Sequence, residues 1–225
     1  MALGNHDFDY GLERTRELAK MANFPMRAAN IVDEQTQQPI FGEPYIIVEK
    51  QGVKIAILTL GYRNTPKTGN PDNVKGLRFS IGQEVAQQYV PKLRKQADLV
   101  VVLSHEGTAV DYKMAREVAG IDLIIGAHSH DIIAPRKRIG QTYVVQAMSD
   151  ASILGDTELI LSGNKLVDVK DHYHWLWHEE WQPDPEVQDL VDKLRKPHLT
   201  KLREKVVESR DVIGRQYKSE SPFDK

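Results

Sequence analysis

The sequence predicts an α/β fold in which short buried strands alternate with amphipathic helices. Two stretches carry this prediction, ADLVVVLSH at 97–105 and IDLIIGAHSH at 121–130, because each holds an apolar run that ends abruptly in polar residues. Short apolar runs bounded in this way are typical of buried strands. Segments with helical spacing of apolar residues separate the runs, so we expect βαβα connections.

In the first half of the chain, a helix is expected at 12–22, where apolar residues recur on one face. We expect a strand at 25–32, which reads PMRAANIV, and a hairpin of two β-rich runs at 45–48 and 54–60. The segment 61–76 is rich in Asn, Pro, Thr and Gly, which predicts a loop.

The second half of the chain continues the alternation of helices and strands. The expected elements are a helix at 81–96, a strand at 97–105, a short helix at 111–118, a strand at 123–125, a strand at 143–147 and a hairpin of 159–161 with 166–169. A further helical segment is expected at 183–209, with an interruption near Pro197, because proline cannot continue a helix without losing a hydrogen bond.

Polar residues follow three of the apolar runs, in the segments GNHD at 4–7, SHEG at 104–107 and GAHSH at 126–130. Open α/β sheets bind their ligands at the carboxyl ends of the strands. Imidazole, amide and carboxylate groups are metal ligands, so the three segments predict one metal-binding cavity. The alternative is that these histidines are solvated loop residues.

Taken in this order, GNHD, SHEG and GAHSH resemble the calcineurin-like metallophosphoesterases. Within that superfamily the chain is most similar to the 5′-nucleotidase branch, whose segments typically read GNHEFDYG, LSHLG and GGHSH. The likeness extends through NVKGLRF at 73–79 and VVQAMSDASILGDTEL at 144–159. It implies a metallophosphatase-type αββα sandwich that hydrolyses phosphate monoesters of nucleotides or related compounds by a metal-bound hydroxide.

The resemblance also implies a set of ligands for two divalent metal ions. Asn5, His105 and His128 match ligands of one metal ion, and His130 matches a ligand of the other. Neutral imidazoles and an amide oxygen bind a cation without cancelling its charge. These ligand types accept Mn, Zn, Fe or Co, so the sequence does not distinguish the metal.

Two further residues match catalytic positions of the family. His6 matches the imidazole that stabilises the developing charge or protonates the leaving oxygen, and Asp7 matches the carboxylate that orients this imidazole. Glu106 follows a matched ligand directly, and we expect its side chain to face solvent. No substrate-binding residue is assigned.

The family carries an Asp-x-His and a Gly-Asp segment upstream of GNHD, whereas three residues precede Gly4 in this sequence. We therefore expect residues 1–180 to form a truncated metallophosphoesterase-like domain that lacks its first strands. We expect residues 181–225 to form a C-terminal helical linker toward an absent nucleotide-binding domain. Such a chain would have an incomplete metal centre and weak or no hydrolytic activity.

Composition narrows the classes of partner. The 225 residues carry a net charge of −2 from 30 basic and 32 acidic residues, which gives no electrostatic reason for binding nucleic-acid polymers or membranes. The chain has no cysteine, so disulfides and thiolate ligands are excluded. No apolar run reaches the length of a membrane span, and we see no signal peptide. We expect a small phosphorylated substrate, and a periplasmic or secreted location for the full-length relative.

Two other functions stay open. The runs DYKMAREVAGIDLIIGAHSHD and DPEVQDLVDKLRKPH are also similar to the thiosulfohydrolases of bacterial sulfur oxidation, which belong to the same superfamily. A function of a different class is a non-catalytic interaction module that retains one metal ion or none. Oligomeric state does not follow from the sequence.

Overall fold

A computed structural model of the chain describes residues 1–177, 179–210 and 212. The chain divides into two compact units, Met1–Trp177 and His178–Lys225. The first unit contains the strands of the described chain and the three polar segments identified above. Each unit is described by itself.

The first unit is organised around a six-stranded sheet. Its strand order is β2 (Tyr45–Lys50), β3 (Val53–Leu60), β5 (Leu99–Ser104), β6 (Leu123–Gly126), β8 (Thr142–Ala147) and β7 (Ile132–Ile139). The four inner strands are parallel, and the two edge strands run antiparallel to their neighbours.

The register of the parallel strands brings their carboxyl ends to the same level. Leu60 of β3 pairs with Ser104 of β5, and Ser104 pairs with Gly126 of β6. Residues that follow these three strand ends therefore leave the sheet along one edge. This register places the segments SHEG and GAHSH next to each other.

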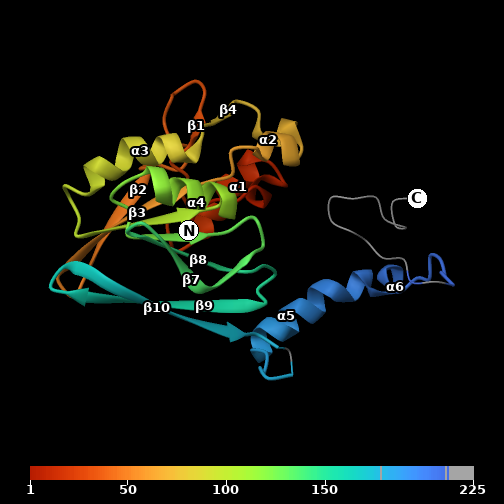
Figure 1. Cartoon of the computed structure of the whole chain (residues 1–225). Coiled ribbons are helices and arrows are strands. Elements are labelled where there is room, and N and C mark those ends of the chain that lie inside the picture. The colour runs from red at the N-terminus through yellow and green to blue at the C-terminus, as the bar shows by residue number, and fades with distance from the viewer. Residues whose placement is uncertain (178, 211, 213–225) are drawn as a thin grey trace. The chain divides into compact units, whose positions relative to one another are not determined.

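Helices α3 (Gly82–Leu93) and α4 (Thr108–Glu117) cover one face of the sheet, as Figure 1 shows. Apolar side chains of both helices pack on alternate residues of the strands, such as Leu58, Val100 and Val102. Burial of these side chains supplies most of the stability of this layer.

The opposite face of the sheet is covered by a second β layer. Strands β9 (Ile153–Ser162) and β10 (Lys165–Trp175) form an antiparallel hairpin. Val169 of this hairpin is fully buried and packs with Val101, Leu123 and Val145 of the central sheet. The first unit is therefore layered as helices, central sheet and hairpin (Figure 1).

The N-terminal residues form a smaller core of their own. It joins Leu3, Phe8 and Ile31 to the helix α1 (Leu12–Met21) and to the antiparallel pair of β1 (Ile31–Asp33) with β4 (Leu77–Phe79). The remaining short elements are the 3-10 helices η1 (His6–Phe8) and η2 (Pro71–Val74) and the helix α2 (Thr65–Thr68).

The described part of the second unit is helical between Pro185 and Leu202. Helix α5 (Pro185–Arg195) begins at Asp184, whose carboxylate accepts hydrogen bonds from the N–H groups of Glu186 and Val187. A 3-10 turn η3 (Lys196–His198) contains Pro197 and leads to α6 (Leu199–Leu202). None of the described helices is long and apolar enough to cross a membrane.

The predicted α/β class is confirmed, with several local differences. The segment 61–76, expected to be a loop, contains α2 and η2. The strand expected at 25–32 is regular only from Ile31, because a turn bond from Ile31 N–H to the Ala28 carbonyl interrupts it. Helix α4 begins at Thr108 instead of residue 111, because the distant Ser129 hydroxyl accepts the Thr108 N–H at 3.1 Å. The last helical segment ends at Leu202, seven residues before the expected end.

A carboxyl group is buried between α4 and the end of β6. Asp111 is fully buried, and its Oδ1 lies 2.5 Å from the Ser104 hydroxyl. Its Oδ2 has no hydrogen-bond partner among the described residues, and it occupies the space that a Cβ at Gly126 would need. Burial raises the pKa of Asp111 from its ordinary value of 3.8 to about 7, and the nearby Glu106 charge adds to this shift.

We predict that Asp111 makes the stability of the chain pH-dependent. The folded state holds the Asp111 proton more tightly than the unfolded chain, so the free energy of unfolding falls as pH rises from about 4 to about 7. Asp111→Asn removes this titration, so between pH 4 and 8 the variant should gain roughly 2 to 4 kcal/mol relative to the wild type. Urea unfolding of both proteins across this range measures the difference, and parallel pH profiles would contradict the prediction.

Candidate metal centre

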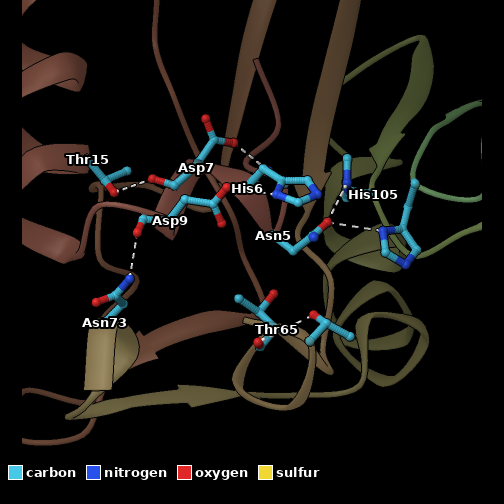
Figure 2. A network of polar contacts seen from close by, with 11 residues as sticks. Asn5, His6, Asp7, Asp9, Thr15, Thr65, Asn73 and His105 are labelled. Atoms are coloured by element: carbon cyan, nitrogen blue, oxygen red, sulfur yellow. Dashed lines mark hydrogen bonds and ion pairs between the residues drawn. The ribbon is translucent and has the colours of Figure 1, made fainter. Parts of the chain in front are cut away.

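Three side chains from three distant parts of the sequence converge on one point. The Asn5 Oδ1 atom lies 3.1 Å from His105 Nε2 and 3.1 Å from His128 Nδ1. Figure 2 shows Asn5 facing His105 across this point. Asn5 precedes η1, His105 follows β5, and His128 lies two residues after β6. The predicted meeting of these three residues is what the structure shows.

The distances from the Asn5 oxygen to the two ring nitrogens are compatible with a shared cation. Ligand atoms about 2.1 Å from one cation, at angles of about 90 to 110°, lie about 3.0 to 3.4 Å from one another. The two contacts of the Asn5 oxygen fall in this range. Without a cation, each ring nitrogen can instead carry a proton and donate a hydrogen bond to the amide oxygen.

The protonation of the two rings favours metal binding. Burial, together with the neighbouring rings of His128, His6 and His130, lowers the pKa of His105 to about 4. Burial and the charges of His130 and His6 also lower the pKa of His128. Both rings are therefore neutral at pH 7, the form in which imidazole binds a metal ion.

The GNHD turn is built to hold Asn5 against His105. The Gly4 N–H donates to the Asp7 carboxylate at 2.6 Å, and the Thr15 hydroxyl of α1 donates to the Asp7 carbonyl at 2.5 Å. Burial raises the pKa of Asp7, which its hydrogen bond from Gly4 partly offsets. A Cβ at position 4 would lie 2.7 Å from His105 Cε1, so only glycine leaves room for this ring.

The role expected for Asp7 is corrected by this geometry. The carboxylate that contacts His6 is Asp9, whose Oδ2 lies 2.8 Å from His6 Nδ1 (Figure 2). The Asp7 carboxylate instead accepts the Gly4 N–H and closes the turn. The His6 side chain is 80% exposed, so it is accessible at the rim of the site.

His128 stacks on an aromatic ring and has a strained backbone. The Tyr62 ring, which follows β3, stacks on the His128 ring with centroids 3.7 Å apart and an interplanar angle of 28°. The backbone of His128 has a positive φ of 75°, which is uncommon for a residue with a side chain. The neighbouring loop must therefore stabilise this conformation.

His130 is separate from the three converging side chains, Asn5, His105 and His128. It is exposed, and its backbone also has a positive φ, of 58°. Its charge influences the pKa values of His105 and His128, so it lies near them, but no hydrogen bond joins it to the cluster among the described residues. Within the described chain, no three His, Cys, Asp or Glu side chains together form a metal-binding group.

Glu106 is buried, which contradicts the expectation that it faces solvent. Its carboxylate accepts hydrogen bonds from the N–H of Gly82 at 2.8 Å and from the Asn30 amide at 3.3 Å. Burial raises the pKa of Glu106, although its hydrogen bond from Gly82 works in the opposite direction. Asn30 also bonds the backbone of Gly61 in both directions. No local pattern in the sequence predicts this network, because its partners are 24 to 76 residues apart.

A model of the calcineurin-like phosphoesterase family matches residues 1–131, which include all three polar segments. The chain belongs to the calcineurin-like phosphoesterase family. Membership implies a centre for divalent metal ions, and the convergence of Asn5, His105 and His128 is consistent with that implication.

Relatives of known name extend the comparison. The chain is 39% identical over 145 residues to protein UshA of Yersinia enterocolitica and 39% identical over 145 residues to a 5′-nucleotidase of Vibrio cholerae. Each match covers 58% of this chain and 26% of the relative. The chain therefore matches about a quarter of the length of these relatives.

Solved structures share the fold. A 5′-nucleotidase precursor from Thermus thermophilus is 25% identical with a TM-score of 0.79, over 92% of this chain and 45% of that one. The sulfate thiohydrolase SoxB of the same organism is 26% identical with a TM-score of 0.80, over 86% of this chain and 36% of that one. Both support the mixed α/β fold with a central sheet.

We predict that Gly4→Ala weakens metal binding by at least about tenfold, because the added Cβ displaces the His105 ring by which the cation would be held. Gly69→Ala is the matched control, since a Cβ there meets its nearest neighbour, the Thr65 carbonyl, at an ordinary 3.7 Å. Titration of both variants with Mn²⁺ by calorimetry makes the comparison. Equal affinity of the two variants would contradict the prediction.

Proposed function

We propose that this chain carries part of the metal centre of a 5′-nucleotidase-like phosphoesterase. The complete enzyme would hydrolyse phosphate monoesters of nucleotides or related small compounds. The observation that carries the proposal is the convergence of Asn5 Oδ1, His105 Nε2 and His128 Nδ1 in a chain of this family. The names of its relatives from Vibrio cholerae and Thermus thermophilus support the choice of a nucleotide substrate.

The residues fit the roles that this function requires. Asn5, His105 and His128 would hold one divalent cation, and His130 would contribute to the second. A divalent cation held there would supply Lewis-acid chemistry, favouring charge build-up on the phosphate and activation of water. The chain's own residues keep two imidazoles neutral and hold the amide oxygen fixed between them.

His6 is proposed as the group that assists departure of the alcohol. It is exposed at the rim of the site, and its Nδ1 contacts the Asp9 carboxylate at 2.8 Å. This contact leaves the Nε2 atom free to carry a proton toward the leaving oxygen, while Asp9 orients the ring. Asp9 therefore takes the orienting role that the sequence suggested for Asp7.

Metal binding tests the centre itself. We expect His105→Ala to weaken Mn²⁺ binding by more than about tenfold, because it removes one of three converging donors. His172→Ala is the control, because His172 is exposed on β10 and lies outside the cluster. A metal content of zero in the wild-type chain would overturn the proposal and favour the non-catalytic interaction module.

The three donors that converge among the described residues include no carboxylate, so we expect the 225-residue chain to hydrolyse phosphate monoesters weakly. Release of phosphate from AMP and from 4-nitrophenyl phosphate measures this, with His105→Ala as the background. Rapid, metal-dependent hydrolysis by the isolated 225 residues would show that the centre is complete as it stands.

The structural similarity to the sulfate thiohydrolase SoxB favours a second candidate, a thiosulfohydrolase-like enzyme that acts on a sulfonate-like group. An assay that compares the release of phosphate with the release of sulfate by the full-length protein distinguishes the two functions. We propose a periplasmic or secreted location for that protein, on the resemblance to the 5′-nucleotidase branch.

A further inference from the structure

Gln146 is a buried polar residue that the proposed function does not yet use. It lies on β8, and 2% of its surface is exposed. An amide buried to this extent must find hydrogen-bond partners, because an unsatisfied polar group in the interior destabilises the fold. Its partners identify the part of the molecule that depends on it.

The side-chain amide of Gln146 faces the loop that carries His128 and His130. With its oxygen directed to this loop, Oε1 accepts the N–H of Asp131 at 2.9 Å, the N–H of His130 at 3.2 Å and the Ser129 hydroxyl at 3.1 Å. The amide nitrogen then donates to the Thr108 hydroxyl at 3.2 Å. In the reverse orientation the amide nitrogen would face the backbone N–H groups of His130 and Asp131, which can only donate, so we assign the first orientation.

The loop needs such support because its backbone is strained. His128 and His130 have positive φ angles of 75° and 58°, a region that residues with a Cβ enter at a cost in free energy. Such conformations persist where the surrounding structure fixes them from several sides. Gln146 binds two successive N–H groups of this loop, and Ser129 binds the first N–H of α4.

We propose that Gln146 is a positioning residue of the metal centre. By holding the loop in its strained conformation, it keeps His128 Nδ1 within reach of Asn5 Oδ1 and so sets the affinity for the cation. This inference rests on the proposed function, because the affinity it governs is that of the proposed centre. Gln146 itself touches neither the cation nor the substrate.

The test uses Gln146→Met in the 225-residue chain, which conserves volume and removes both the acceptor and the donor. Thr142→Val is the matched control, because Thr142 is buried on the same strand and its hydroxyl bonds the Ile121 carbonyl, away from the loop. The first readout is hydrogen exchange of the His130 and Asp131 amides. The second readout is the Kd for Mn²⁺. It is measured under conditions in which each variant is fully folded, so that a loss of stability alone does not change the Kd.

We expect Gln146→Met to lose protection at both amides and to bind Mn²⁺ 10- to 100-fold more weakly, while Thr142→Val matches the wild type in both readouts. Unchanged protection, or an Mn²⁺ affinity within twofold of the wild type, would overturn the proposal. Should Gln146→Met fail to fold, Ser129→Ala takes its place, because it removes the hydroxyl that joins Gln146 to Thr108.

Failure of the proposed function gives a different result. If the wild-type chain binds no Mn²⁺, the metal centre is refuted, and the proposal that Gln146 sets its affinity is overturned with it. If the wild type binds Mn²⁺ and Gln146→Met binds it equally well, only the positioning role is overturned. The amide readout then shows whether the loop moved without affecting the cation.

Discussion

The register of the parallel strands is the constraint on which the candidate centre depends. Leu60, Ser104 and Gly126 lie side by side at the carboxyl ends of β3, β5 and β6. A shift of one residue in any of these strands would turn its side chains to the opposite face. It would also move His105 or His128 away from the shared point with Asn5. Burial of the sheet on both faces therefore fixes the position of the donors as well as the fold.

The site is stabilised by buried polar contacts of residues that neighbour the proposed metal ligands. Asn30 and Glu106 join the ends of β3 and β5 to the start of α3, while Gln146 joins β8 to the loop after β6. These groups are buried, and Glu106 carries a raised pKa because burial disfavours its charge. The strain in the backbone of His128 adds a further cost. Buried polar groups and local strain of this kind are common where a site must be held rigid.

The fold class and the three converging donors could be predicted from the sequence, because each donor follows an apolar run at the end of a strand or turn. The contacts of Asp9, Glu106 and Gln146 could not, since they depend on the rotamers of neighbours and on partners far along the chain. The start of α4 was predicted wrongly for the same reason, because the first N–H group of this helix bonds the hydroxyl of the distant Ser129. Local patterns identify ligand types, whereas the residues that orient them emerge only from the tertiary structure.

The central claim is that three side chains share one cation. Anomalous X-ray scattering from a crystal of the chain grown with Mn²⁺ tests it most directly. We expect an anomalous peak about 2.0 to 2.3 Å from each of Asn5 Oδ1, His105 Nε2 and His128 Nδ1. Metal bound elsewhere with these three atoms empty, or the three atoms apart from one another in the crystal, would contradict it.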